Sequence, residues 1–406
     1  MRFKLGNFTF GGGSRIRLRF FDWFLIIGLT FAPMTGLRIW KVGPAEVLCL
    51  IWGIRFMLKT KFRMTDLLKF FIGFIGAMLL GSLVGYLIAR SQLRISGVLT
   101  WVYLAFIALS MEIGLSENEV EYNEKLLFVF SAMAVAFQLF LYIYSQRISM
   151  TFFGAPLWYH GVRYSGGGTN PHQVAVLLCG TIFVFFRQIA KKKNIIISIL
   201  LIAADVFLLK ETESSTGIMA IVLGGVVMIF LAITNLRNKR RRVQLMLIAI
   251  FSIAIVLLLT YSYIFSFMNK WLEEDSNGMG RLEIFSSFGE CFKKSPLFGI
   301  GPGMHGGGGT IEFHNTYLEI LAATGAVGMT FFILYTVRCI KKLWRADWTL
   351  IPIMTSLYAY SLAGFAMRRL AYWGVMVLIM VIAQGKLKSY DFGPKRGNIG
   401  YSNSIR

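Results

Sequence analysis

Residues 68–89 read LKFFIGFIGAMLLGSLVGYLIA, an apolar run of 22 residues with a single charge, at Lys69. A helix rises about 1.5 Å per residue, so this run is long enough to cross a hydrocarbon core about 30 Å thick. Eleven other apolar stretches follow the same pattern. We therefore expect an all-α polytopic membrane protein with about 12 transmembrane helices. The twelve expected spans are Phe21–Leu37, Val42–Leu58, Leu68–Ala89, Ile95–Leu115, Leu126–Tyr144, Val174–Ile189, Ile195–Leu209, Gly217–Ile233, Val243–Phe265, Thr316–Val337, Leu350–Phe365 and Trp373–Ala383.

The composition excludes most soluble classes. Of the 406 residues, 56% are apolar and only 15% are charged, and the formal net charge is +22. A soluble domain carries about a quarter of its residues as Asp, Glu, Lys or Arg. A basic nucleic-acid binder would place its Lys and Arg on a polar scaffold, so no nucleic-acid partner is expected.

The distribution of Lys and Arg predicts the orientation. With an even number of spans both termini lie on one side, and the segments on that side hold 27 of the 42 Lys and Arg against 13 on the other side. Short cytoplasmic loops are the basic ones, so both termini are predicted to be cytoplasmic. Residues 1–20 then form a cytoplasmic leader, 21–385 the transmembrane domain and 386–406 a basic tail. Most of the net charge is explained by orientation in the membrane.

Two outer loops, 145–173 and 266–315, are longer than a helix connection needs and contain all four histidines of the chain. Long ordered loops often carry function, and histidine titrates nearest neutral pH. The first loop contains Arg163, then three glycines, then Asn170-Pro171 ahead of a helix that is expected to begin near His172. A helix N-terminus near an arginine is a potential anion site, although a flexible turn would show the same pattern.

The second loop is predicted to hold short amphipathic helices at the membrane surface. Its stretch from Arg281 to Phe292 spaces Phe285, Phe288 and Phe292 on one face. A glycine-rich turn at 296–303 follows, and His314-Asn315 opens the tenth span. His314 is therefore expected at a helix N-terminus at the water interface.

These motifs resemble the bacterial O-antigen ligase and polymerase superfamily of integral-membrane glycosyltransferases. The resemblance rests on His314-Asn315, followed after nine residues by Gly325-Ala326-Val327-Gly328. It is supported by Arg281, by the 296–303 turn, and by Arg163 ahead of Asn170-Pro171. One departure is Thr216, which stands after Ser214-Ser215 where many members carry an arginine.

The resemblance implies transfer of a glycan from a polyprenyl diphosphate to a sugar hydroxyl, with the transmembrane domain as the catalytic domain. His314 would be the general base that removes the hydroxyl proton. Arg163 and Arg281 would contact the diphosphate, because arginine binds such oxygens in a bidentate manner. Asn170, His172, Asn315 and Tyr317 are assigned to substrate binding on the same basis.

No metal and no other cofactor is expected, because the outer acidic residues form no Asp-x-Asp pair. Glu283, Glu290 or Glu312 could orient His314 or replace it as base, and the sequence does not rank them.

Three functions remain open. The favoured one is a polymerase whose acceptor is another lipid-linked repeat unit. The alternative is a ligase whose acceptor is the lipid A core, and a less favoured alternative is a twelve-span transporter or lipid-linked oligosaccharide flippase. The expected partners are an undecaprenyl-diphosphate-linked oligosaccharide, membrane lipids, and a chain-length regulator or other assembly proteins. The expected location is the cytoplasmic membrane of a bacterium, with the active site facing the periplasm.

Overall fold

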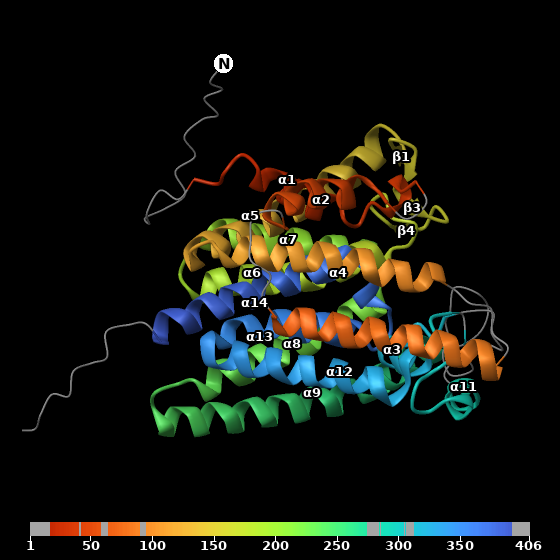
Figure 1. Ribbon diagram of the computed structural model, residues 1–406. Coiled ribbons are helices and arrows are strands. Elements are labelled where there is room, and N and C mark those ends of the chain that lie inside the picture. The colour runs from red at the N-terminus through yellow and green to blue at the C-terminus, as the bar shows by residue number, and fades with distance from the viewer. Residues whose placement is uncertain are drawn as a thin grey trace, which may run out of the picture.

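The computed structural model describes residues 17–39, 42–57, 64–89, 95–273, 284, 286–303, 305 and 312–391. These residues form a bundle of long helices with two short β-hairpins at one corner (Figure 1). The helices are α1 (Asp22–Phe31), α2 (Pro44–Met57), α3 (Asp66–Ala89), α4 (Ile95–Ser116), α5 (Val120–Arg147), α6 (His172–Ala190), α7 (Ile195–Glu211), α8 (Ser215–Thr234), α9 (Lys239–Glu273), α11 (Phe288–Lys294), α12 (Thr316–Ala346), α13 (Ile351–Tyr360) and α14 (Leu370–Asp391). Short 3₁₀ turns η1 (Thr35–Leu37), η3 (Trp348–Leu350) and η4 (Ala366–Arg368) lie between helices.

A helix occupies each of the twelve stretches predicted as spans, so the mainly helical class is confirmed. Within the described residues, seven helices are long and apolar enough to cross a membrane: α3, α4, α5, α6, α8, α12 and α14. Among the others, α1 and α13 have only 10 residues each. The sequence extended these two because apolar residues continue beyond them into turns that are not helical. The opposite holds for α14, which has 22 residues because its helix continues past the apolar run.

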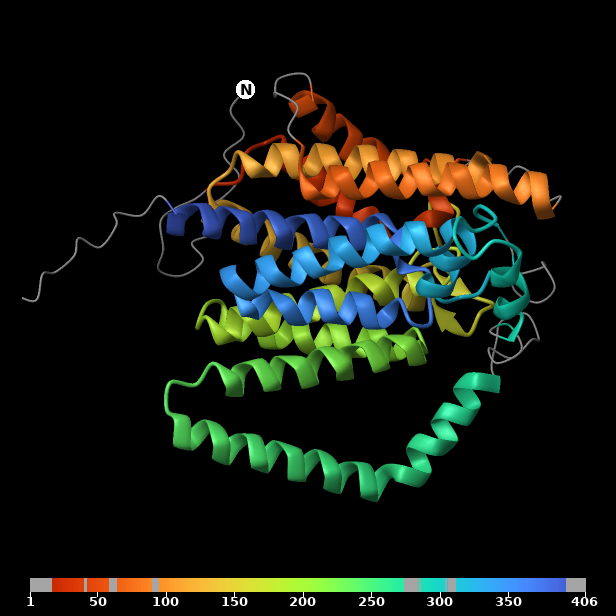
Figure 2. The ribbon, with the colours of Figure 1, turned by 60° about the horizontal axis from the view of Figure 1, so that its bottom comes forward.

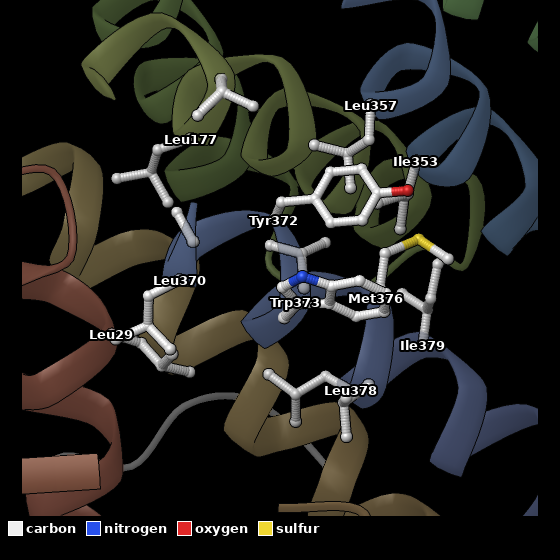
Figure 3. Packing of buried hydrophobic residues seen from close by; sticks show 14 of the residues in the cluster. Leu29, Leu177, Ile353, Leu357, Leu370, Tyr372, Trp373, Met376, Leu378 and Ile379 are labelled. Carbon is white, nitrogen blue, oxygen red and sulfur yellow. The ribbon is translucent and has the colours of Figure 1, made fainter. Parts of the chain in front are cut away.

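The centre of the bundle is formed by α14 and α6, the two most buried of the seven candidate spans. Figure 3 shows Tyr372, Trp373 and Met376 of α14 packed with Leu177 of α6 and Leu357 of α13. The rings of Tyr372 and Trp373 meet edge to face, with centroids 5.3 Å apart. Such aromatic packing contributes beyond the buried area alone.

The outward faces are apolar, as expected for contact with lipid. Along α3 the side chains of Ile72, Leu79, Leu83 and Leu87 are all exposed and recur at helical spacing. Helix α9 lies at the edge of the bundle, where it contacts α8 and diverges from the remaining helices (Figure 2). Exposed apolar helices of this length are stable when lipid covers them, because their backbone groups are satisfied internally.

The bundle has two chemically different ends. Helices α6, α12 and α14 begin at one of them, with His172, Thr316 and Leu370, and we call it the His314 end. The same helices finish at the opposite end, which we call the Arg187 end.

A buried ion-pair network closes the Arg187 end. The Arg187 side chain is fully buried, and its Nη2 donates to Oε1 of Glu124 at 2.5 Å and to Oδ2 of Asp347 at 2.9 Å. Lys191 pairs with Glu124 at 2.9 Å, and Lys386 with Asp347 at 2.6 Å. Burial alone would raise the pKa of Asp347, but the charges of Arg187 and Lys191 hold it well below its usual range. The network therefore joins four segments that are distant in sequence.

Helix α12 is broken at Gly325, which has φ 59° and ψ −160°. The backbone groups released by the break are bonded by the glycine-rich turn: Ala326 N donates to Pro296 O at 2.9 Å, and Ile300 N donates to Ala322 O at 2.8 Å. Buried backbone groups must find such partners in an apolar environment. The break thus fixes the turn against the first part of α12, the part that follows His314.

Replacing Gly325 by alanine should destabilise the protein. A Cβ at this position would lie 2.4 Å from the carbonyl carbon and oxygen of Leu297, and the left-handed backbone disfavours any side chain. Strained backbone of this kind costs about 1–3 kcal/mol before the clash is counted. We expect a lower melting temperature in detergent. Gly76→Ala is the control, because a Cβ there meets nothing within 4 Å. Equal melting temperatures for the two variants would contradict the role of Gly325.

Candidate active site

His314 lies just before the first residue of α12 and is half-buried. Its backbone has φ 50°, in the left-handed region that few residues other than glycine adopt. Hydrogen bonds on both sides hold it there. The amide of Phe313 donates to Oε1 of Glu319 at 2.6 Å, and Oδ1 of Asn315 accepts from the amide of Tyr317 at 2.9 Å. Backbone strain fixed in this manner is often found at functional sites.

The segment from 361 to 369, between α13 and α14, is fastened to this helix start. Asn315 Nδ2 donates to Leu362 O at 2.7 Å, and Thr316 Oγ1 donates to Gly364 O at 2.7 Å. The Thr316 amide donates to Ser361 O at 2.9 Å. The position of His314 is therefore coupled to that of the 361–369 segment.

Glu312 is the acidic residue that lies beside His314. It forms an ion pair with Arg368, and its carboxylate and the His314 ring are close enough for their charges to interact. Burial alone would raise the pKa of Glu312, but Arg368 lowers it below its usual range. Of the other two candidates, Glu290 is exposed on α11 and Glu283 lies outside the described residues.

The first outer loop folds into two β-hairpins. The strands β1 (Thr151–Phe152) and β2 (Ala155–Pro156) pair with each other, as do β3 (Trp158–Tyr159) and β4 (Arg163–Tyr164). Arg163 on β4 donates from Nε to Thr212 O at 3.1 Å and from Nη2 to Glu213 O at 3.3 Å. These carbonyls orient the guanidinium without neutralising its charge.

Asn170 and His172 form the start of α6. Asn170 Oδ1 accepts a hydrogen bond from the His172 amide at 2.8 Å, as a capping side chain does. The His172 ring reaches across to α13, where its Nδ1 lies 2.6 Å from the hydroxyl of Tyr360. The helix start predicted near His172 is therefore confirmed, and it is tied to the 361–369 segment through the end of α13.

The structure gathers these groups at the His314 end. The charges of Arg163 and Arg369 both act on Tyr360. The charges of Arg369 and His314 both act on Glu312. One continuous set of polar groups therefore joins the first outer loop to the start of α12.

Four other residues that the sequence singled out remain: Arg281, Asn315, Tyr317 and Thr216. Arg281 lies outside the described residues. The hydroxyl of Tyr317 donates to Tyr358 O at 2.8 Å, and the Asn315 side chain is occupied by the bonds given above, so the contacts seen for both residues stabilise the fold. Thr216 is buried, and its hydroxyl has no partner among the described residues. The substrate-binding roles of Asn315 and Tyr317 stay predictions.

Three further arginines, which no sequence motif marks as site residues, act on one another in this region: Arg38, Arg368 and Arg369. Arg38 pairs with Glu46, and its segment is joined to the first outer loop, where Gly36 N donates to Gly167 O at 2.9 Å. The sequence feature that could have revealed two of them is the doublet Arg368-Arg369, which falls in a predicted outer loop, where basic residues are few.

A pocket opens beside the site, between α3, α4 and the start of α12. Its lining combines the charged groups Glu319 and Arg368 with apolar side chains and loop residues, among them Met78, Trp101, Pro302 and Phe365. Such a mixed lining suits an amphipathic substrate. The described residues contain no group of three His, Cys, Asp or Glu side chains that could hold a metal ion.

The fold and the site together define a helical membrane protein with a polar, arginine-rich site at one end. Residues 197–333, from within α7 to within α12, match the family model described as O-antigen ligase. The matched segment includes His314, Asn315 and the glycines at 325 and 328, so the resemblance to the O-antigen ligase and polymerase superfamily is confirmed. No curated protein matches the chain. The family match supports a membrane enzyme of the glycosyltransferase type.

Proposed function

We propose that this protein is a surface-polysaccharide polymerase. It transfers a glycan from undecaprenyl diphosphate to a sugar hydroxyl of another lipid-linked repeat unit, on the outer face of the cytoplasmic membrane. The observation that carries the proposal is the placement of His314. This residue lies half-buried at the head of α12, within the segment that matches the O-antigen ligase family. It lies close to Glu312, on which the charges of Arg368 and Arg369 act.

In the proposed reaction His314 acts as general base. Its ring takes the proton of the acceptor hydroxyl while the hydroxyl oxygen forms a bond to the anomeric carbon of the donor. The bond from that carbon to the diphosphate oxygen breaks, and the lipid diphosphate leaves with the electron pair. No hydrogen bond to another described residue occupies the His314 ring, so the ring is available to an acceptor. Glu312, held ionised by Arg368, is better suited to stabilising a protonated His314 than to replacing it.

The departing diphosphate needs cationic partners. Arg163 suits this role because backbone carbonyls fix its guanidinium while its charge remains uncompensated by them. We include Arg281 as a second contact. The reaction as proposed requires no metal ion.

The proposed topology has twelve spans with the Arg187 end in the cytoplasm and the His314 end in the periplasm. The excess of Lys and Arg in the loops at the Arg187 end supports this orientation. The partners in this proposal are the lipid-linked oligosaccharide, membrane lipids, and a chain-length regulator or other assembly proteins.

The second candidate is a ligase that transfers the glycan to the lipid A core. It is favoured by the description of the matching family model, O-antigen ligase. Donor, base and diphosphate contacts would be the same, and only the acceptor would differ.

Purified protein should extend lipid-linked repeat units into a ladder of chain lengths without any lipid A core, and it should do so in the presence of EDTA. A ladder is expected because the acceptor carries the same diphosphate lipid as the donor, so each product can take part in a further round of transfer. Products are separated by gel electrophoresis. Absence of extension unless lipid A core is added would replace the polymerase by the ligase, and loss of the ladder in EDTA alone would refute metal independence.

A further inference from the structure

The 361–369 segment carries two arginines that neither the sequence analysis nor the reaction above has used. Arg368 and Arg369 follow the stretch that is bonded to Asn315 and Thr316. Since these bonds hold the segment against the start of α12, both arginines are kept close to His314.

Two of the three arginines in this region already have carboxylate partners. Arg38 pairs with Glu46, whose other oxygen accepts from the Gly43 amide at 2.9 Å. Arg368 pairs with Glu312 and also lies over the ring of Phe365, 4.4 Å from its centroid. Both guanidinium groups are thus compensated by the protein itself.

Arg369 differs from its neighbours. Within the described part of the chain its side chain makes no ion pair and no hydrogen bond, although its backbone amide donates to Ala366 O at 2.9 Å. Burial, followed by the charge of Arg368, lowers the pKa of Arg369 to about 10, so the side chain still carries its charge at neutral pH. The charge of Glu312 opposes this lowering, but Glu312 already pairs with Arg368. A bound anion would offset the positive charge that remains.

The place of Arg369 indicates which anion. Its charge acts on Tyr360, which Arg163 also influences, and on Glu312, which His314 also influences. Arg369 therefore belongs to the same end of the bundle as the proposed diphosphate contact and the proposed base, on a segment that is bonded to the start of α12. A diphosphate bound here would lie at the same end of the bundle as the base.

We propose that Arg369, flanked by the Arg38–Glu46 and Arg368–Glu312 ion pairs, binds the diphosphate of the lipid-linked donor beside His314. The inference rests on the proposed donor and adds a contact from the segment between α13 and α14. A guanidinium can hold two diphosphate oxygens at once, which an ammonium cannot do with the same geometry. Thr216, which stands where many members of the superfamily carry an arginine, is buried and has no guanidinium to offer such a contact.

The test measures binding of undecaprenyl diphosphate to purified protein in an uncharged detergent, without acceptor. Arg369→Gln should raise the dissociation constant at least about tenfold, which corresponds to a loss of about 1.4 kcal/mol in binding free energy. Arg369→Lys should give an intermediate dissociation constant, because lysine keeps the positive charge but cannot bind two diphosphate oxygens with the planar guanidinium geometry. Arg147→Gln, at an exposed arginine of α5, is the control and should bind as the wild type does.

A second measurement separates binding from folding. Because Arg369→Gln removes a buried positive charge that has no ion pair of its own, its melting temperature without ligand should equal or exceed that of the wild type. Inorganic pyrophosphate should raise the melting temperature of the wild type and not that of Arg369→Gln. A lower melting temperature for ligand-free Arg369→Gln, or unchanged binding of the lipid diphosphate, would refute the site.

Further arms identify the source of the anion and isolate the inference from the proposed function. Equal stabilisation by phosphatidylglycerol would indicate a general lipid headgroup site and would overturn the proposal. If Arg369→Gln weakens binding of the lipid diphosphate but the wild type forms no glycan products, the diphosphate site is supported and the proposed polymerase function is refuted. If the wild type forms the ladder and Arg369→Gln binds the lipid diphosphate normally, the polymerase function is supported and the diphosphate site at Arg369 is refuted.

Discussion

Polysaccharide synthesis is expected to fall by about 10²- to 10⁴-fold when His314 is replaced, which is the usual contribution of a general base. Without the imidazole, the acceptor hydroxyl would have to lose its proton to water as the glycosidic bond forms. The rate of ladder formation by purified protein measures the loss. Binding of undecaprenyl diphosphate should be nearly unchanged, because the base contacts the acceptor.

The choice of substitution matters because His314 has a left-handed backbone. Asparagine tolerates that conformation better than alanine, so His314→Asn tests the chemistry with the least risk to folding. The matched control is His160→Asn, at an exposed histidine on the β3–β4 hairpin that has the same φ of 50°. Normal ladder formation by a correctly folded His314→Asn protein would exclude His314 as the base and would revive the transporter alternative.

The largest loss of stability is expected for Arg187→Ala, at about 3–5 kcal/mol. The side chain is fully buried and pairs with both Glu124 and Asp347, so its removal leaves two carboxylates with less compensation in a poorly solvated place. The melting temperature in detergent measures the effect.

Lys191→Ala is the control for this prediction. Lys191 is more exposed, and Arg187 and Lys386 remain to compensate the same carboxylates, so a loss of at most about 1 kcal/mol is expected. Similar melting temperatures for the two variants would show that the network does not stabilise the bundle as described.

Much of the fold could be predicted because membrane helices are defined locally. A membrane helix satisfies most of its backbone within one continuous apolar stretch, so all twelve stretches contain a helix. The exception is α12, whose break at Gly325 is bonded by a distant turn. The errors occur where apolar sequence and helix do not coincide. In α1 and α13 apolar residues continue into turns, while α14 continues as a helix into polar sequence.

The candidate site was only partly accessible to sequence reasoning. His314, Arg163 and His172 stand near glycines, helix starts and loops that can be recognised one at a time. Arg38 lies near no such motif, and Arg369 is marked only by the Arg368-Arg369 doublet. An arginine that is paired with a carboxylate and one that is not look alike in a sequence. The spacing between His314 and Gly325 could be recognised as a motif, but its cause lies in the turn that fills the break in α12.

The sequence by itself determined the helical membrane class, the apolar stretches that form the helices and the residues available for chemistry, because each depends on composition and on contacts between near neighbours. Only the tertiary structure decided which charges compensate one another. The pairs Arg38–Glu46, Arg368–Glu312 and Arg187–Asp347 depend on how the helices pack. That packing leaves Arg369 without an ion pair of its own among the described residues. A charge acquires its role from its surroundings, and here those surroundings come from segments far apart in the chain.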